Sequence, residues 1–471
     1  MIMNSFVSPL LPHHRAAGGS NRPYLNLARD DAPKIGPLTI LAIAACAAVI
    51  GWIGFEGSIV VAGVLYGILF VLLTILRADL AFLIIFMQAP LMWDLTGGSV
   101  KMAMGDISLV LATLVLLIRL IQSGRGIAFN PMRWPIAIYL TVCVLSTLLN
   151  GTIVESVTSM LQMLLYMGLA VFVYANCIDQ PRQIINALYG LMFTDVFLSV
   201  MMLVLRSNSV LGINKNAMGS ELDYAVVIAV EFWLLGTTRG RGKKLISAML
   251  LILGAALIFS LSRGAWLGTV VGILVLLSLH GQFRLALKTV FILTPIVICC
   301  WLLLPQQSVD YAVNFSSSAY NIRARYESVA FAMDFFRQSP MLGAGVGLRK
   351  MYDATNVIMS TLAETGLVGL VAFLSIFVAM FRMAWKTCRA TDPRSPIFTL
   401  SAIGAALMAA KFAHGCVDHY WSRVMLPVWA MAGAAVWSFN ASDKRRRPSV
   451  KMKVESAEPP EVAVEPDLGV S

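Results

Sequence analysis

Residues 245–280 read LISAMLLILGAALIFSLSRGAWLGTVVGILVLLSLH. Arg263 is the only Asp, Glu, Lys or Arg residue in this stretch, and an apolar run lies on each side of it, at 245–261 and 264–280. A helix of about 17 to 25 apolar residues crosses a hydrocarbon core of roughly 30 Å. The stretch therefore predicts two transmembrane helices joined by a tight turn at Arg263.

Similar apolar runs recur along the chain. Of its 471 residues, 58% are hydrophobic and 13% are charged, whereas roughly a quarter of the residues in a soluble domain are charged. This composition excludes an ordinary soluble enzyme and predicts an all-α polytopic membrane protein with about fourteen transmembrane helices. The expected spans are 38–54, 58–76, 79–95, 105–122, 133–149, 157–177, 184–205, 220–237, 245–261, 264–280, 286–304, 359–381, 396–414 and 424–439.

The basic residues set the expected orientation. With these spans, about 25 of the 36 Lys and Arg residues fall on one side, which the positive-inside rule makes cytoplasmic. Both termini are then cytoplasmic, and the net charge of +11 does not indicate a nucleic-acid partner. The expected organisation is a cytoplasmic tail at 1–36, N-terminal transmembrane helices at 37–205, a second transmembrane region at 206–440, and a disordered cytoplasmic tail at 441–471.

One connection, at residues 305–358, is much longer than the others and falls on the external side. Long loops in compact proteins commonly carry function. This loop contains an expected amphipathic helix from Arg325 to Arg337 and a glycine-rich turn at 343–347. We therefore expect it to be ordered and functional.

Some basic residues fall on the external side against the positive-inside rule. They are Lys101, Arg206, Lys215, Arg263, Arg323, Arg325, Arg337, Arg349, Lys350 and Arg423. Arg263 lies in so short a connection that its guanidinium must lie at the membrane boundary. It either reaches the interface beside Trp266 or offers a permanently charged fork to phosphate oxygens.

A polar turn at 212–219 lies between Arg206 and the following apolar run, and it contains Asn214, Lys215 and Asn216. The turn is either a solvated loop or part of a cationic external mouth. Such a mouth suits an anionic substrate at the outer leaflet, for example a lipid diphosphate.

Ionisable residues inside the expected spans include Asp195, Glu231, Lys411 and His414. Ionisable groups within a membrane are costly and are functional candidates by default. Lys411 and His414 lie near the end of their span, so the alternative is that they reach the interface. No cysteine or histidine spacing is typical of a metal site, and we expect neither a metal nor another cofactor.

The order of several short motifs resembles the O-antigen ligase and Wzy-type polymerase family over roughly residues 205–440. The motifs are the turn from Asn214 to Asn216, the turn Ser262-Arg-Gly-Ala-Trp266, the long external loop with Arg325, Pro340-Met-Leu-Gly343-Ala-Gly345 and Thr355-Asn356, and then Leu362-Ala-Glu364-Thr-Gly366.

The resemblance implies a metal-independent glycosyltransferase at the outer face of a bacterial inner membrane. It moves a glycan from undecaprenyl diphosphate to a glycan or lipid acceptor, within the bilayer and beside other polysaccharide assembly proteins. The expected catalytic residues are Arg263, Arg325, Glu364 and Asp353. The expected substrate-binding residues are Arg206, Asn214, Lys215, Asn216, Arg323, Thr355, Asn356 and Arg423.

The chain departs from the family at Thr355, where ligases of the family carry a histidine. Threonine is no general base near neutral pH, so either Asp353, Glu364, Asp418 or His419 replaces the histidine or the acceptor needs no strong base. We therefore favour polymerisation of exopolysaccharide or O-antigen repeat units. Ligation of finished glycan is the second hypothesis, and flipping of a lipid-linked oligosaccharide is the alternative from another class.

Overall fold

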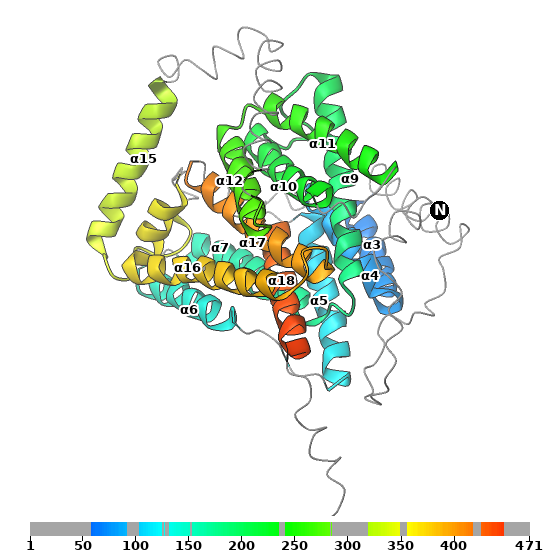
Figure 1. Ribbon diagram of the computed structural model, residues 1–471. Coiled ribbons are helices and arrows are strands. Elements are labelled where there is room, and N and C mark those ends of the chain that lie inside the picture. The colour runs from blue at the N-terminus through cyan, green and yellow to red at the C-terminus, as the bar shows by residue number, and fades with distance from the viewer. Residues whose placement is uncertain are drawn as a thin grey trace, which may run out of the picture.

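The computed structural model describes residues 58–91, 103–124, 127, 131–150, 153–234, 241–282, 284, 319–348, 356–417 and 425–446. Figure 1 shows that these residues form helices joined by turns. They contain no β-strand, only an isolated bridge between Val210 and Ile213. The all-α class expected from the sequence is therefore confirmed for the described part of the chain.

Most helices lie on the expected apolar runs. Their bounds are α3 Ile59–Leu76, α4 Ala78–Gln88, α5 Met104–Gln122, α6 Arg133–Asn150, α7 Ile153–Met163, the π-helical turn η2 Leu164–Ala170, α8 Val171–Asn176, α9 Pro181–Leu205, α10 Lys215–Leu234, α11 Arg241–Phe259, α12 Arg263–Leu279, α15 Ala319–Gln338, α16 Val357–Ala390, α17 Pro396–Gly415 and α18 Leu426–Arg446. However, α4 ends at Gln88 before the expected 95, and α16 and α18 continue to Ala390 and Arg446 beyond the expected 381 and 439. The expected spans 38–54 and 286–304 lie outside the described residues.

Seven described helices are long and apolar enough to cross a membrane, judged by length and composition. They are α5, α6, the continuous helix at 156–176, α9, α11, α16 and α17. The helices α3, α4 and α12 are apolar but shorter. The chain is therefore a multi-pass membrane protein, while the total of fourteen spans and the orientation stay predictions.

The helix α17 lies at the centre of the assembly and is almost completely buried. It packs against α10, α12, α16 and α18. Small residues allow this close contact: a Cβ placed on Gly268 or Gly272 of α12 would lie 2.8 Å and 3.3 Å from backbone carbonyl oxygens of α17. Because α12 fits so tightly against α17, the position of its first residue, Arg263, is fixed by the packing.

The helix α16 is interrupted at Gly366, whose φ of 65° and ψ of −167° are not helical. Residues 340–347, called the glycine turn below, pair with this break through main-chain hydrogen bonds. Ala344 N donates to Ala363 O (2.8 Å), Gly345 N to Glu364 O (3.1 Å) and Leu367 N to Pro340 O (2.9 Å). The long loop is thus joined to α16 by backbone groups.

The same turn is held by the end of α6. Ser146 Oγ donates to Glu364 O (2.6 Å) and accepts from Gly345 N (3.0 Å). Asn150 Nδ2 donates to Gly343 O at 2.8 Å. The glycine turn is therefore fixed between α6 and α16.

The helix predicted in the loop, from Arg325 to Arg337, is confirmed and is longer than expected, because α15 runs from Ala319 to Gln338. It packs against α16. Figure 1 shows α15 at the edge of the molecule, apart from α10 and α12.

Candidate functional site

Four helix ends meet at one end of the assembly, called the loop end below. A Cβ placed on Gly219, near the start of α10, would lie 2.5 Å from Ser262 Cβ at the start of α12. A Cβ on Gly264 would lie 2.5 Å from the Cδ2 atom of His414, near the end of α17. The start of α16 joins them, because Asn356 Nδ2 donates to Cys416 O at 2.9 Å. Segments far apart in sequence therefore converge around Arg263.

The turn before α12 is fastened by short-range hydrogen bonds. Leu261 adopts a left-handed conformation with φ 55°. Ser260 Oγ and Trp266 Nε1 both donate to Leu257 O, at 2.7 Å and 2.8 Å. Trp266 is therefore bonded to the end of α11, and the half-buried Arg263 begins α12. A helix start offers unpaired N–H groups and a positive dipole end, so a cation there makes a strong site for an anion.

The start of α10 is built by its asparagine cap. Asn214 Oδ1 accepts from Asn216 N (3.1 Å) and Ala217 N (3.0 Å), which places Lys215 in the first turn. Gly212, with φ 74°, allows the reversal before it. Lys215 is half-buried, and Arg206 ends α9 as an exposed residue with φ 49°. The structure thus brings Lys215 to the loop end, where α12 also begins, and gives Asn214 a capping contact.

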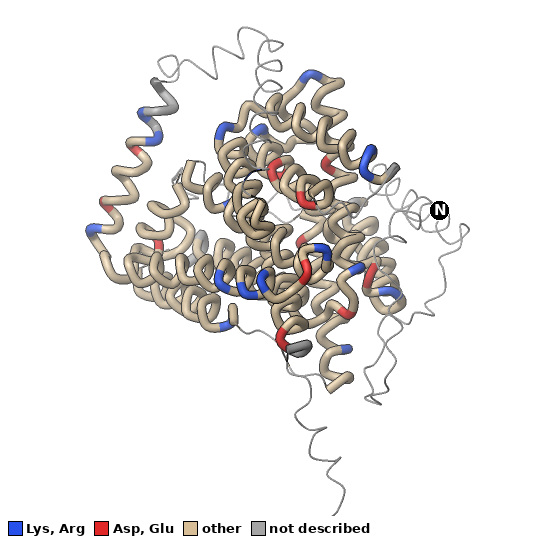
Figure 2. The backbone as a smooth tube through the Cα atoms, viewed as in Figure 1, with Lys and Arg blue, Asp and Glu red and all other residues tan. Residues whose placement is uncertain are grey.

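A network of buried polar side chains from α10, α12 and α17 lies further inside the assembly than the loop end. Lys411 Nζ donates to Ser220 Oγ at 3.1 Å and is close enough to Glu221 and Asp223 for direct electrostatic attraction. Thr269 Oγ1 donates to Asp223 Oδ1 at 2.9 Å. Figure 2 shows acidic positions of α10 in the middle of the helical assembly. Charges buried this deeply are costly unless they are paired or hydrated, so the network is a functional candidate.

Several atoms of the network have no hydrogen-bond partner among the described residues. They are both carboxylate oxygens of Asp195 and of Glu221, Asp223 Oδ2, both ring nitrogens of His414, and Ser262 Oγ. Buried polar groups are almost always satisfied by protein, water or a ligand. These unpartnered atoms add to the case that the network is a functional candidate.

Asp195, Lys411 and His414 were candidates from the sequence, whereas Glu221 and Asp223 were not. Their signal was available, since two carboxylates two positions apart in an apolar run are rare. The alternative that Lys411 and His414 reach the membrane interface is wrong, because both side chains are completely buried between helices.

Glu231 has a separate environment at the other end of α10. Its Oε2 atom lies 2.8 Å from His280 Nε2 of α12, and both side chains are buried. This pair links α10 to α12 far from Arg263.

The loop arginines are not brought to Arg263. Arg323 and Arg325 are exposed on α15, and Arg323 Nε pairs with Glu327 Oε1 at 2.7 Å. Figure 1 shows α15 apart from α12. Other expected or alternative residues lie outside the described part of the chain; they are Asp353, Thr355, Asp418, His419 and Arg423.

Two further expected site residues make contacts within the scaffold. The Glu364 side chain is buried, and its Oε1 atom accepts from Gly347 N at 2.9 Å. Asn356 caps α16, since its Oδ1 atom accepts from Ile358 N at 2.9 Å. Both residues therefore hold the loop in place at the loop end. No group of three or more His, Cys, Asp or Glu residues in the described ranges could hold a metal ion.

Comparison with known proteins identifies one family. Residues 248–374 match the model of a family described as O-antigen ligase. The matched range contains Arg263, α15, the glycine turn and the break in α16, whereas α10 and α17 lie outside it. No curated protein matches the chain. The resemblance inferred from the sequence is thus confirmed for residues 248–374, which are similar to the O-antigen ligase family.

Proposed function

We propose that the protein is a membrane glycosyltransferase that polymerises repeat units of an exopolysaccharide or O-antigen carried on undecaprenyl diphosphate. The observation that carries the proposal is the position of Arg263. It begins α12 beside the start of α10, within the range matched by the O-antigen ligase family. We place the reaction at the periplasmic face of a bacterial inner membrane.

In the proposed reaction, the oxygen of an acceptor hydroxyl forms a bond to the anomeric carbon of the donor. The bond between that carbon and the diphosphate oxygen breaks, the hydroxyl proton is lost, and the diphosphate leaves on its lipid. Negative charge grows on the departing diphosphate. Arg263, Lys215 and the N–H groups at the start of α12 would stabilise this charge, and Arg206 would attract the donor.

The proton acceptor is a separate part of the proposal. Asp353 is retained as a candidate near Thr355. Because the Glu364 carboxylate already accepts from Gly347 N, we give Glu364 a role in positioning the glycine turn. We propose that Asn216, Arg323, Arg325, Thr355, Asn356 and Arg423 contribute to substrate binding or loop position.

Deleting the gene in its host and profiling the glycans tests the proposal. We expect single repeat units to accumulate on undecaprenyl diphosphate while long polymer disappears. Full-length polymer that accumulates on the lipid without reaching its acceptor would instead assign the ligase function. Lipid-linked repeat units trapped on the cytoplasmic leaflet would identify a flippase and overturn the proposal.

A further inference from the structure

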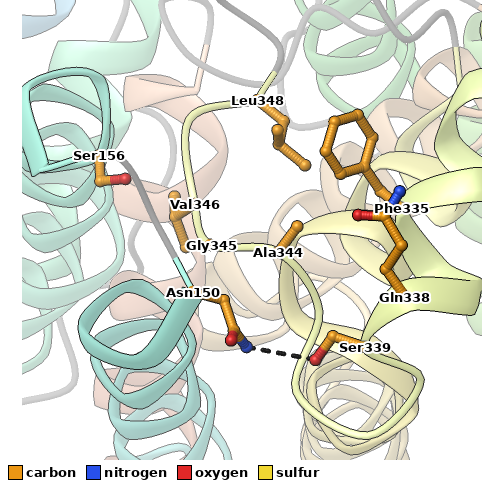
Figure 3. A pocket seen from close by; sticks show the side chains of 9 residues that line it. All are labelled: Asn150, Ser156, Phe335, Gln338, Ser339, Ala344, Gly345, Val346 and Leu348. Carbon is orange, nitrogen blue, oxygen red and sulfur yellow. Dashed lines mark hydrogen bonds between the residues drawn. The ribbon is translucent and has the colours of Figure 1, made fainter.

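A polar hollow of about 370 Å³ lies beside the glycine turn, away from Arg263. Figure 3 shows residues from α6, α7, α15 and the turn around it. The lining residues are Asn150, Ser156, Phe335, Gln338, Ser339, Ala344, Gly345, Val346 and Leu348. The proposed function assigns this space no role.

The described residues of the lining are polar or apolar, and none of them carries an ionisable side chain. Asn150 and Gln338 provide amides, Ser156 and Ser339 provide hydroxyls, and Phe335 provides an aromatic ring. Amides and hydroxyls both donate and accept hydrogen bonds, as sugar hydroxyls do. A ring beside a few convergent polar groups is the usual composition of a small-molecule site. The chemistry of the lining therefore suits an uncharged sugar.

Ser156 provides an independent observation. Its side chain is 1% exposed, and Figure 3 shows it directed into the hollow. Its Oγ atom has no hydrogen-bond partner among the residues described. A buried hydroxyl left without a hydrogen-bond partner destabilises the folded state. A ligand hydroxyl in the hollow would supply the missing partner.

An apolar hollow of about 270 Å³ lies next to the polar one along the same two helices. Val157 and Leu161 of α7 line it, together with Leu164 of η2 and Val144 of α6. Val157 directly follows Ser156, so consecutive residues of α7 line the two hollows. This order matches a molecule with a sugar head and a hydrocarbon chain.

We infer that the polar hollow is a subsite for an uncharged sugar of a membrane-anchored glycan, whose lipid chain lies in the apolar hollow. The inference rests on the proposed glycan transfer. The two sites share one scaffold, because Asn356 bonds to the end of α17 while Glu364 bonds to the glycine turn. Eight residues of α16, a rise of roughly 12 Å, separate Asn356 from Glu364. The start of α16 therefore connects the scaffold of the hollow to the end of α17, which packs against α12.

Binding by the purified full chain in nanodiscs tests the subsite. The probes are the repeat-unit oligosaccharide, released by mild acid from the host's lipid carrier, and undecaprenyl diphosphate. Ser156→Leu fills the hollow and Gln338→Ala removes an exposed amide. We expect oligosaccharide binding to weaken at least about tenfold and about fivefold, respectively, with undecaprenyl diphosphate binding unchanged. Gln162→Ala, an amide on α7 outside the lining, is the matched control.

The outcomes separate this inference from the proposed function. If the folded Gln338→Ala and Ser156→Leu variants both bind the oligosaccharide as the parent chain does, the subsite is overturned. The proposed function is not affected by that result. Failure of undecaprenyl diphosphate to bind the parent chain, with normal polymer from Arg263→Ala, overturns the proposed function. In a transfer assay, a raised KM for the acceptor or for the donor assigns the sugar to that substrate, and no change in either overturns the subsite.

Discussion

Gly366 is required by both its conformation and its surroundings. Its φ is 65°, and a Cβ there would lie 2.3 Å from the Met341 carbonyl carbon. Gly281 has nearly the same φ, 66°, but nothing lies within 4 Å of its Cβ position. We expect Gly281→Ala to cost about 1 to 2 kcal/mol, and Gly366→Ala at least twice as much because backbone must move. Thermal unfolding in detergent checks this, and equal losses would contradict the pairing of the glycine turn with α16.

Arg263 should be essential for transfer without being essential for folding. Arg263→Ala is expected to reduce polymer formation at least about 100-fold, because charge on the leaving group would be unstabilised. Arg263→Lys should also be poor if the guanidinium binds phosphate through two hydrogen bonds. Polymer length and amount in a complemented deletion strain are the measurements.

Arg182→Ala serves as the control for this pair, since Arg182 is exposed near the start of α9, far along that helix from Arg206. Normal polymer from a well-inserted Arg263→Ala protein would remove Arg263 from the proposed mechanism.

Lys411 is expected to be coupled to the carboxylates around it. Lys411→Met leaves Glu221 and Asp223 without their nearby cation, and removing one partner of a buried ion pair costs about 3 to 5 kcal/mol. The double variant Lys411→Met/Glu221→Gln should recover part of that loss. A double-mutant cycle on thermal stability measures the coupling. Lys243→Met, at an exposed position, should have little effect. Strict additivity would show that the two groups do not interact.

The junction between α16 and α17 depends on two separate contacts of Asn356. Its Oδ1 atom caps α16, and its Nδ2 atom donates to Cys416 O. Asn356→Asp keeps the cap and loses the donor, whereas Asn356→Ala loses both. We expect the alanine variant to be less stable than the aspartate variant by about 1 kcal/mol.

Ser395→Ala gives the reference for this comparison, because Ser395 only caps α17 through Ile397 N at 3.3 Å. Unfolding temperatures in one detergent compare the three variants. If Asn356→Asp and Asn356→Ala were equally stable, the cap would contribute nothing.

Most helices could be predicted from the sequence because a bilayer leaves few alternatives. Backbone groups in hydrocarbon must be paired within a helix, so a long apolar run almost determines one. The runs at 58–76, 105–122 and 396–414 became α3, α5 and α17 within two residues at each end. The break at Gly366 and the π-helical turn η2 were not predicted. The break depends on contacts with the distant glycine turn, which no local pattern encodes.

The candidate site was predicted only in part, for the same reason. Arg263 was identifiable as a lone charge between two apolar runs. The partnership of Lys411 with Ser220 joins residues 191 positions apart, so only the folded chain reveals it. Arg325 looked equivalent to Arg263 in the sequence, but α15 holds it elsewhere.

The orientation of the whole protein in the membrane can be tested with introduced cysteines. Glu327→Cys on α15 should react with a membrane-impermeant maleimide in intact cells, and Lys386→Cys on α16 only after permeabilisation. Figure 2 shows basic positions gathered on the later part of α16, as expected for a cytoplasmic end.

The cysteines already present in the parent chain determine the background level of this labelling. Of its seven cysteines, three of the four described are buried. Burial raises the pKa of the Cys416 thiol, so this half-buried group is a weak nucleophile at neutral pH. Labelling of Lys386→Cys alone in intact cells would invert the proposed orientation.

The glycine turn attaches the long loop to the break in α16, and this attachment does not depend on the residues of the loop that would recognise a glycan. Main-chain groups hold residues 340–347, and most of them are independent of side-chain identity. The residues of α15 can therefore drift in evolution without releasing the loop from its support. New glycan preferences can arise on an unchanged anchor, much as antibody loops diversify on a constant framework.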